Sequence, residues 1–172
     1  MPKLVDLKAK PYNLSDKQVA WVNETIAGMT DEEKVGQLFT NLFFFGNDAF
    51  SGNDFTNQEI VEKFHIGGAR YHGNSKEDIQ DLLNDLQSMS KIPLLVAANC
   101  DSGGNGACSE GTYIASGAQA EAAGDLQVSY HAGLVSAREE TALGVNFNFD
   151  PCVDIVSSWR NTIVNTRDYG RD

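Results

Sequence analysis

Side chains that could bind a polar ligand follow or end short apolar runs in this chain. If those runs are parallel strands, their carboxyl ends meet at one edge of a sheet, where such proteins bind ligands. Carboxylates, amides and arginine at this edge would suit a neutral, polyhydroxylated ligand, because each can hydrogen-bond a hydroxyl group. The predicted ligand-binding residues are His72, Asn99, Asp101, Asp154 and Arg167.

Three aspartates in the same region suggest a second kind of chemistry. Asp101, Asp150 and Asp154 offer the pair of carboxyl groups that glycosidic cleavage requires. Spacing along the chain does not give the separation of two carboxyl groups, on which that mechanism depends. Asp150 also precedes Pro151, a position that favours a role in shaping a turn.

The glycine-rich loop 103–106 has two interpretations. It could hold a phosphate, as in a doubly wound nucleotide-binding domain, or it could form a tight turn. No P-loop pattern is present, and the third glycine of the dinucleotide motif is replaced by Ser109. A tight turn is the favoured interpretation, and a nucleotide-binding domain is kept as an alternative.

Helix signals recur along the chain. Capping residues occur at Ser15 with Gln18, Thr30 with Glu33, Thr56 with Glu59, and Ser75. The last opens a helix with an apolar face made of Ile79, Leu82, Leu83 and Leu86. The helix after Thr30 is expected to turn Val35 and Leu38 inward. A long helix is predicted over 118–143, with Leu126 and Tyr130 on its apolar face and Gly144 ending it.

Apolar runs alternate with these helices and predict strands at 38–45, 67–72 and 93–100, and a fourth that begins at 145–149 and extends past Pro151 towards Ile155. The third run is nearly all apolar, which is typical of a strand covered on both faces, with Cys100 in the core. This alternation indicates an α/β fold with a parallel sheet. Two architectures fit: a doubly wound sheet, or the N-terminal half of a (β/α)8 TIM barrel. The end of the chain after a polar loop favours the truncated barrel.

Composition narrows the classes of partner. The 172 residues carry a net charge of −11, which disfavours binding to nucleic acid or an anionic membrane. No apolar run approaches the roughly 20 residues of a membrane span, and no secretory signal is visible. Three cysteines without ligand spacing predict reduced thiols in the cytoplasm, no metal site and no cofactor.

Four stretches resemble the N-terminal barrel domain of glycoside hydrolase family 3. Residues 29–38 resemble its opening helix, M-[ST]-x-E-E-K-[IV]-G-Q-[LM], and residues 65–69 its second strand. Residues 92–104 resemble I-P-L-L-[IV]-[AG]-x-D-x-E-G-G, with the acids changed. Residues 143–155 and 165–170 resemble G-[IV]-N-x-[NT]-[FL]-A-P-x-x-D-[IV] and [GN]-x-R-[ST]-[FY]-G. The β-N-acetylhexosaminidase-like branch is the most similar, followed by β-glucosidases.

The resemblance implies a retaining β-glycosidase with an aspartate nucleophile and a general acid/base. In the family both groups follow the Arg-x-x-Gly motif, so they are expected beyond Asp172 and no catalytic residue is assigned here. Arg167 matches an arginine that hydrogen-bonds sugar hydroxyls, and the strand-end carboxylate is expected to be Asp101, with Asn99 beside it. Asp154 matches an aspartate that orients loop residues, Arg167 among them.

The predicted domain organisation is a partial family 3 domain, with an arm at 1–14 and the first four βα units at 15–172. Such a half barrel exposes strand edges, so it is expected to self-associate or pair with the missing half and to be inactive alone. A saccharide is the predicted partner. The alternatives are a β-glucosidase-type member and a non-catalytic saccharide-binding half barrel.

Overall fold

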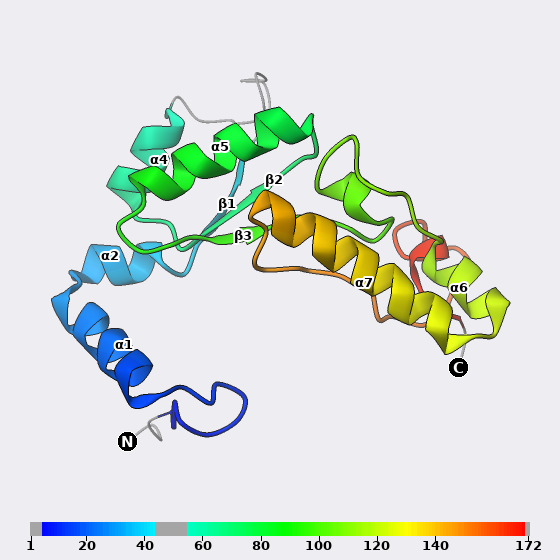
Figure 1. Cartoon of the computed structure of the whole chain (residues 1–172), viewed down its shortest axis with the longest axis horizontal. Helices are drawn as coiled ribbons and strands as arrows, with labels where there is room; N and C mark the ends of the chain where they lie inside the picture. Colours follow the sequence, from blue (N-terminus) through cyan, green and yellow to red (C-terminus); the bar gives the residue numbers. More distant parts are fainter. Residues whose placement is uncertain (1–4, 44–54, 171–172) are drawn as a thin grey trace.

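A three-stranded parallel sheet organises the chain in the computed structural model, which describes residues 5–43 and 55–170 (Figure 1). Its strands, in order across the sheet, are β1 (Thr40–Phe43), β2 (Gly68–Tyr71) and β3 (Leu95–Ala97). Thr40 pairs with Gly68, which pairs in turn with Leu95. Each strand lies inside a predicted apolar run, although residues 44 and 45 of the first run lie outside the described residues. The α/β class with a parallel sheet is therefore confirmed.

All four predicted capping signals start helices. Ser15, Thr30 and Thr56 each form a complete capping box, and the Ser75 hydroxyl accepts a hydrogen bond from a backbone N–H. The helices are α1 (Asp16–Gly28), α2 (Asp31–Gly36), α4 (Asn57–Phe64) and α5 (Lys76–Met89). A capping box joins residues only three positions apart, so the local sequence is enough to predict it.

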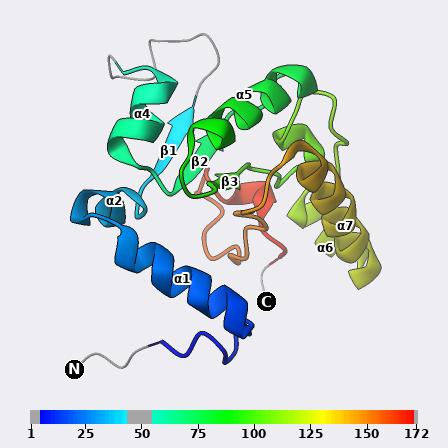
Figure 2. The same cartoon turned by 60° about the vertical axis from the view of Figure 1, so that its left-hand side comes forward.

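The apolar core lies between the sheet and the helices α4 and α5, which run side by side (Figure 2). The predicted face of α5 supplies Ile79, Leu83 and Leu86 to this core. They pack in one cluster with Leu94 and with Val96 of β3. By contrast, α1 has no buried residue and extends away from the sheet (Figures 1 and 2).

The single helix predicted over 118–143 is two helices, α6 (Gly117–Ala123) and α7 (Leu126–Leu143). Gly124 ends α6 in the left-handed conformation at φ 64°, and the Asp125 side chain accepts a hydrogen bond from the N–H of Gln127. A C-terminal glycine followed by an N-cap aspartate is a strong local break, and it outweighs the apolar periodicity. Gly144 ends α7 as predicted.

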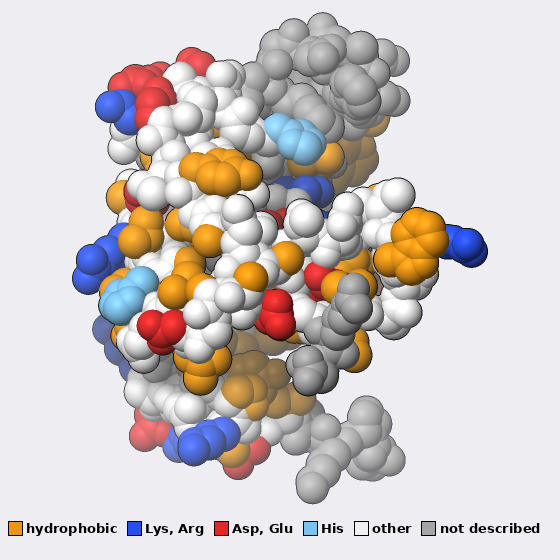
Figure 3. Space-filling view, turned by 90° about the vertical axis from the view of Figure 1, so that its right-hand side faces the viewer, with side chains coloured by type: hydrophobic (Ala, Val, Ile, Leu, Met, Phe, Trp, Pro, Cys, Tyr) orange, Lys and Arg blue, Asp and Glu red, His pale blue; other side chains and the backbone are white. Residues whose placement is uncertain are grey.

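Several apolar side chains predicted to be buried are exposed. Leu126 is 87% exposed, Leu38 is 83% exposed, and Val35 and Tyr130 are exposed too. These predictions were wrong because periodicity identifies a face of a helix but not the neighbour that covers it. Figure 3, which views the molecule from the side of α6 and α7, shows hydrophobic side chains spread over this surface.

The fourth predicted strand, from 145–149 towards Ile155, does not form; residues 146 and 147 bond to β3 without making a ladder. The N–H groups of Asn146 and Phe147 both donate to the carbonyl of Val96, at 3.1 and 3.0 Å. The N–H of Val96 donates to Oδ1 of Asn146 at 2.8 Å, so a side chain replaces the carbonyl that a paired strand would present. Leu95 is 49% exposed, so β3 is not covered on both faces as predicted.

The cap of α6 supports a segment that carries Arg167. Helix α6 packs against the short 3-10 turn η2 (Asn165–Arg167), and a Cβ at Gly117 would lie 2.5 Å from the carbonyl oxygen of Arg167. The Ser116 hydroxyl accepts a hydrogen bond from the N–H of Gln119 at 3.3 Å, and the Gln119 side chain accepts the Ser116 N–H at 3.0 Å.

Removing this cap should lower the stability of the protein. We expect Ser116→Ala to reduce the free energy of unfolding by about 1 kcal/mol, measured by urea denaturation, because an N–H of α6 loses its acceptor. Ser116→Gly is the control and should cost only a few tenths of a kcal/mol, since glycine leaves room for water at the cap. Equal losses in the two variants would contradict this account.

Candidate functional site

An ion pair joins the two residues that carry most of the predicted binding site. Nη2 and Nε of Arg167 both donate to Oδ2 of Asp101, at 2.7 and 3.1 Å. Asp101 follows the end of β3, and Arg167 lies 66 positions later in η2. The Asp101 carboxylate raises the pKa of the Arg167 guanidinium. Both side chains keep some exposure, so a ligand can reach them.

The other three predicted residues are dispersed around this pair. Asn99 is exposed beside the buried Cys100, and His72 is exposed at the end of β2. Asp154 is exposed and accepts a hydrogen bond from the Cys152 thiol at 3.2 Å. The carboxylate that holds Arg167 is therefore Asp101, and not Asp154 as the sequence suggested. The role of these residues in substrate binding stays a prediction.

Asp150 belongs to the site, although its sequence context suggested a turn. Its Oδ2 accepts the N–H of Cys100, the residue before Asp101, and both aspartates line the same cavity. Burial is the main cause that raises the pKa of Asp150 to about 7, and the neighbouring carboxyl groups of Asp101 and Glu140 add to it. A carboxyl group with this pKa exchanges a proton at neutral pH.

Glu140 is a buried carboxyl group that sequence analysis missed. It lies on α7 with 4% of its surface exposed, and its Oε1 accepts a hydrogen bond from Nδ2 of Asn148 at 3.1 Å. Burial raises the pKa of Glu140, and the nearby Cys100 thiol partly offsets this rise. The sequence did contain a signal for its burial. Glu140 follows Gly133 and Ala137 at helical spacing, so it lies on the helix face that was predicted to be apolar and buried.

A cavity of about 530 Å³ opens beside the Asp101 and Asp150 carboxyl groups. Asn148 and Ser136 add polar groups, and the Ser136 hydroxyl is buried without a hydrogen-bond partner among the described residues. Apolar and aromatic walls come from Ile114, Tyr130, Leu134 and Tyr169. Polar groups that can bind hydroxyls, set among apolar walls that can cover C–H faces, are the chemistry of a sugar site.

The glycine-rich loop is a structural turn. It forms the 3-10 turn η1 (Gly104–Gly106), in which a Cβ at Gly106 would lie 1.7 Å from the carbonyl oxygen of Asn99. A Cβ at Gly104 would lie 1.8 Å from Oε2 of Glu139, which accepts the N–H of Thr112. Close packing explains these two glycines, so the tight-turn prediction is confirmed and the loop offers no support for a phosphate site.

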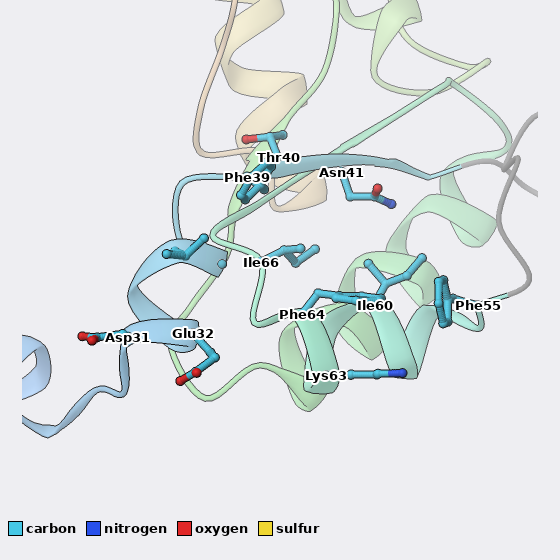
Figure 4. A pocket seen from close by; sticks show the side chains of 12 residues that line it. Asp31, Glu32, Phe39, Thr40, Asn41, Phe55, Ile60, Lys63, Phe64 and Ile66 are labelled. Carbon is cyan, nitrogen blue, oxygen red and sulfur yellow. The ribbon is translucent and has the colours of Figure 1, made fainter.

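A second cavity, of about 700 Å³, lies against β1, α2 and α4 (Figure 4). Its walls are mainly apolar and include Phe39, Phe55, Ile60 and Phe64, with Asp31, Glu32 and Lys63 also lining it. It shares no lining residue with the cavity at Asp101. An apolar surface beside a sheet edge is suited to packing against other protein elements rather than to binding a polar ligand.

Two negative findings apply to residues 5–43 and 55–170. No three His, Cys, Asp or Glu side chains in these ranges are arranged to hold a metal ion. None of the helices there combines the length and apolar character needed to cross a membrane.

Comparisons with known proteins agree with the sugar-binding chemistry of the cavity at Asp101. The model of the "Glycosyl hydrolase family 3 N terminal domain" matches residues 30–172. A beta-N-acetylglucosaminidase/beta-glucosidase of Cellulomonas fimi is 34% identical over 169 residues, which cover 98% of this chain and 29% of that protein. Beta-hexosaminidase A of Pseudoalteromonas piscicida is 28% identical over 128 residues, which cover 66% of this chain and 21% of that protein.

Solved structures are similar over the same part of the chain. The beta-glucoside phosphorylase BglX bound to 2FGlc has a TM-score of 0.86 and 36% identity, covering 96% of this chain and 29% of that one. A second structure of beta-glucoside phosphorylase BglX has a TM-score of 0.83 and 37% identity. The chain thus spans less than a third of the length of the proteins that it matches.

Proposed function

Because the chain belongs to glycosyl hydrolase family 3, whose N-terminal domain matches residues 30–172, we propose that it is part of an enzyme that cleaves β-linked glycosides. The observation that carries this proposal is the Arg167–Asp101 pair beside a cavity with both polar and aromatic walls. In this proposal Arg167 donates to sugar hydroxyls and Asp101 accepts from them. Asn99, His72 and Asp154 contribute further substrate contacts.

The proposed mechanism assigns binding, and not bond cleavage, to these 172 residues. Retaining glycosidases need a carboxylate nucleophile and an acid/base that protonates the leaving group. We place both groups in the remainder of a longer polypeptide, as the resemblance implies, since the relatives are more than three times as long. The chain alone is then inactive, and residues 15–172 supply the first βα units of a TIM barrel that the rest completes.

Exposed surfaces support the pairing of this chain with further protein. Among the described strands β1 is at the sheet edge, and the apolar cavity of Figure 4 lies next to it. Leu38 is one of several exposed apolar side chains near this edge. The pairing partner is either the rest of the polypeptide or a second copy. We also propose a cytoplasmic location, because Cys100, Cys108 and Cys152 are all unpaired thiols.

The acceptor of the glycosyl group defines a second candidate function. In hydrolysis the acceptor is water, and in phosphorolysis it is inorganic phosphate, which leaves with the sugar as a glycosyl phosphate. Phosphorolysis is a candidate because both solved structures described above are of a beta-glucoside phosphorylase. Hydrolysis stays the first proposal, since the two curated relatives have glycosidase names.

Turnover by the longest natural polypeptide that contains this sequence tests the proposal. We expect it to release p-nitrophenol from the β-N-acetylglucosaminide or the β-glucoside, and the preferred one identifies the branch. Adding inorganic phosphate separates the two acceptors, because a phosphorylase is accelerated and yields a sugar phosphate. The 172-residue chain is the control and should release nothing. Absence of turnover by the long polypeptide on both substrates would overturn the proposal.

A further inference from the structure

Asp101 and Asp150 place two carboxyl groups in the lining of one cavity. Asp101 follows β3, and Asp150 follows the segment 145–149, so the two groups come from separate parts of the chain. An extra carboxyl group beside Asp101 needs a physical reason, because two ionised carboxylates in contact repel each other.

One carboxylate oxygen of Asp101 lacks a hydrogen-bond donor among the described residues, so a second carboxyl group that carries a proton could supply one. Both donors from Arg167 go to Oδ2 of Asp101. Oδ1 is buried and receives no hydrogen bond from a donor among the described residues. The carboxyl group of Asp150 lines the same cavity as Asp101, so a proton on Asp150 is available to satisfy Oδ1 of Asp101. The N–H of Cys100 holds Asp150 from its other side.

We propose that Asp150 is a positioning residue, which shares one proton with Asp101 and thereby holds the Asp101 carboxylate against Arg167. The proposal rests on the proposed function, because it takes Asp101 and Arg167 as substrate contacts. Asp150 itself transfers no proton to or from the substrate in this account. Its effect on activity is to keep the geometry of the ion pair constant while substrate binds.

The surroundings of Asp150 favour the protonated form below neutral pH. The titratable and charged groups that face it are Cys100 and Asp101 from the end of β3, Glu140 from α7, and Arg167 from η2. Burial is the main cause of the raised pKa of about 7, and the two neighbouring carboxyl groups add to it. As the pH rises through this value, Asp150 ionises and repels Asp101.

Substitution of Asp150 in the longest natural polypeptide, assayed on the β-glycoside that it cleaves, tests the proposal. Asparagine can donate to Asp101 and accept from Cys100, so Asp150→Asn should keep kcat/KM within about twofold of the unmodified enzyme in mildly acidic solution. Asp150→Ala should lower kcat/KM by about 10- to 100-fold, because Asp101 loses its support. Asp81→Asn, on the exposed surface of α5, is the matched control and should change nothing.

The pH profile separates positioning from a merely structural role. The unmodified enzyme should lose kcat/KM as the pH rises through about 7, and Asp150→Asn should lack this part of the decline. Wild-type activity in Asp150→Ala, or an unchanged profile in Asp150→Asn, would overturn the proposal.

Thermal unfolding distinguishes failure of this proposal from failure of the proposed function. If the unmodified polypeptide cleaves no β-glycoside, the proposed function fails, but the shared proton can still be tested. Folded Asp150 keeps its proton up to about pH 7, whereas an ordinary aspartate loses it near 3.8. Folding therefore weakens as the pH rises between these values, and Asp150→Asn should show a smaller fall in Tm from about pH 4 to about pH 8. Equal slopes in the two proteins would reject the shared proton.

Discussion

Replacing Arg167 by alanine is expected to lower kcat/KM of the longest natural polypeptide for its β-glycoside by about 100-fold. The reason is the loss of two charge-assisted hydrogen bonds from Arg167 to sugar hydroxyls, at about 1.5 kcal/mol each. The Asp101 carboxylate, which accepts both donors in the structure, would be left in the site without its cation. Lysine restores the charge but not the paired donors, so Arg167→Lys should recover only part of the activity.

The Arg167 prediction has a matched control on the same chain. Arg138 is exposed on α7, and Arg138→Ala removes an equal charge without touching the site. Its kcat/KM should stay within about twofold of the unmodified enzyme, since isolated surface charges contribute little. If the two alanine variants lose the same activity, the loss is an effect of net charge, and the assignment of Arg167 to substrate binding fails.

Replacing Leu86 by alanine is expected to produce the largest loss of stability, about 2–5 kcal/mol in the free energy of unfolding. Leu86 is fully buried on α5 and packs in the cluster that joins this helix to β3. Truncation removes apolar contacts and leaves a cavity, which the sheet on one side and the helix backbone on the other cannot close. Urea denaturation of the purified protein measures the change.

Leu126 provides the comparison for Leu86. It is the same residue type on α7, but it is 87% exposed. Leu126→Ala should therefore change the free energy of unfolding by less than about 0.5 kcal/mol. If the two substitutions prove equally costly, Leu126 is covered in the natural protein, which would support pairing of this surface with further polypeptide. A loss below about 1 kcal/mol at Leu86 would contradict the described core.

Much of the secondary structure could be predicted because its causes are local. The capping boxes at Ser15, Thr30 and Thr56 each join residues three positions apart, and all three start helices. The apolar face of α5 was also predictable, because its covering surface is the sheet that the neighbouring runs form. The break at Gly124 was also a local signal, but the apolar periodicity on either side of it was given too much weight.

The ligand site was predictable only in part. The type of residue at the end of each strand indicated Asp101, and the family resemblance indicated Arg167. Neither signal could show that Arg167 pairs with Asp101, a residue 66 positions away. The carboxylate that was expected to orient Arg167, Asp154, instead accepts the Cys152 thiol.

Local residue order was thus enough to establish the parallel α/β class, the helix starts and the family. The folded chain was needed to bring Asp150 and Glu140 near Asp101 and Cys100, because they come from separate segments. Hydrogen bonds hold the 145–149 segment to Val96 of β3 and join Asn148 to Glu140 of α7. The raised pKa of Asp150 has the same origin. Desolvation and carboxyl–carboxyl contact depend on which groups surround a side chain in space, and spacing along a chain does not specify those neighbours.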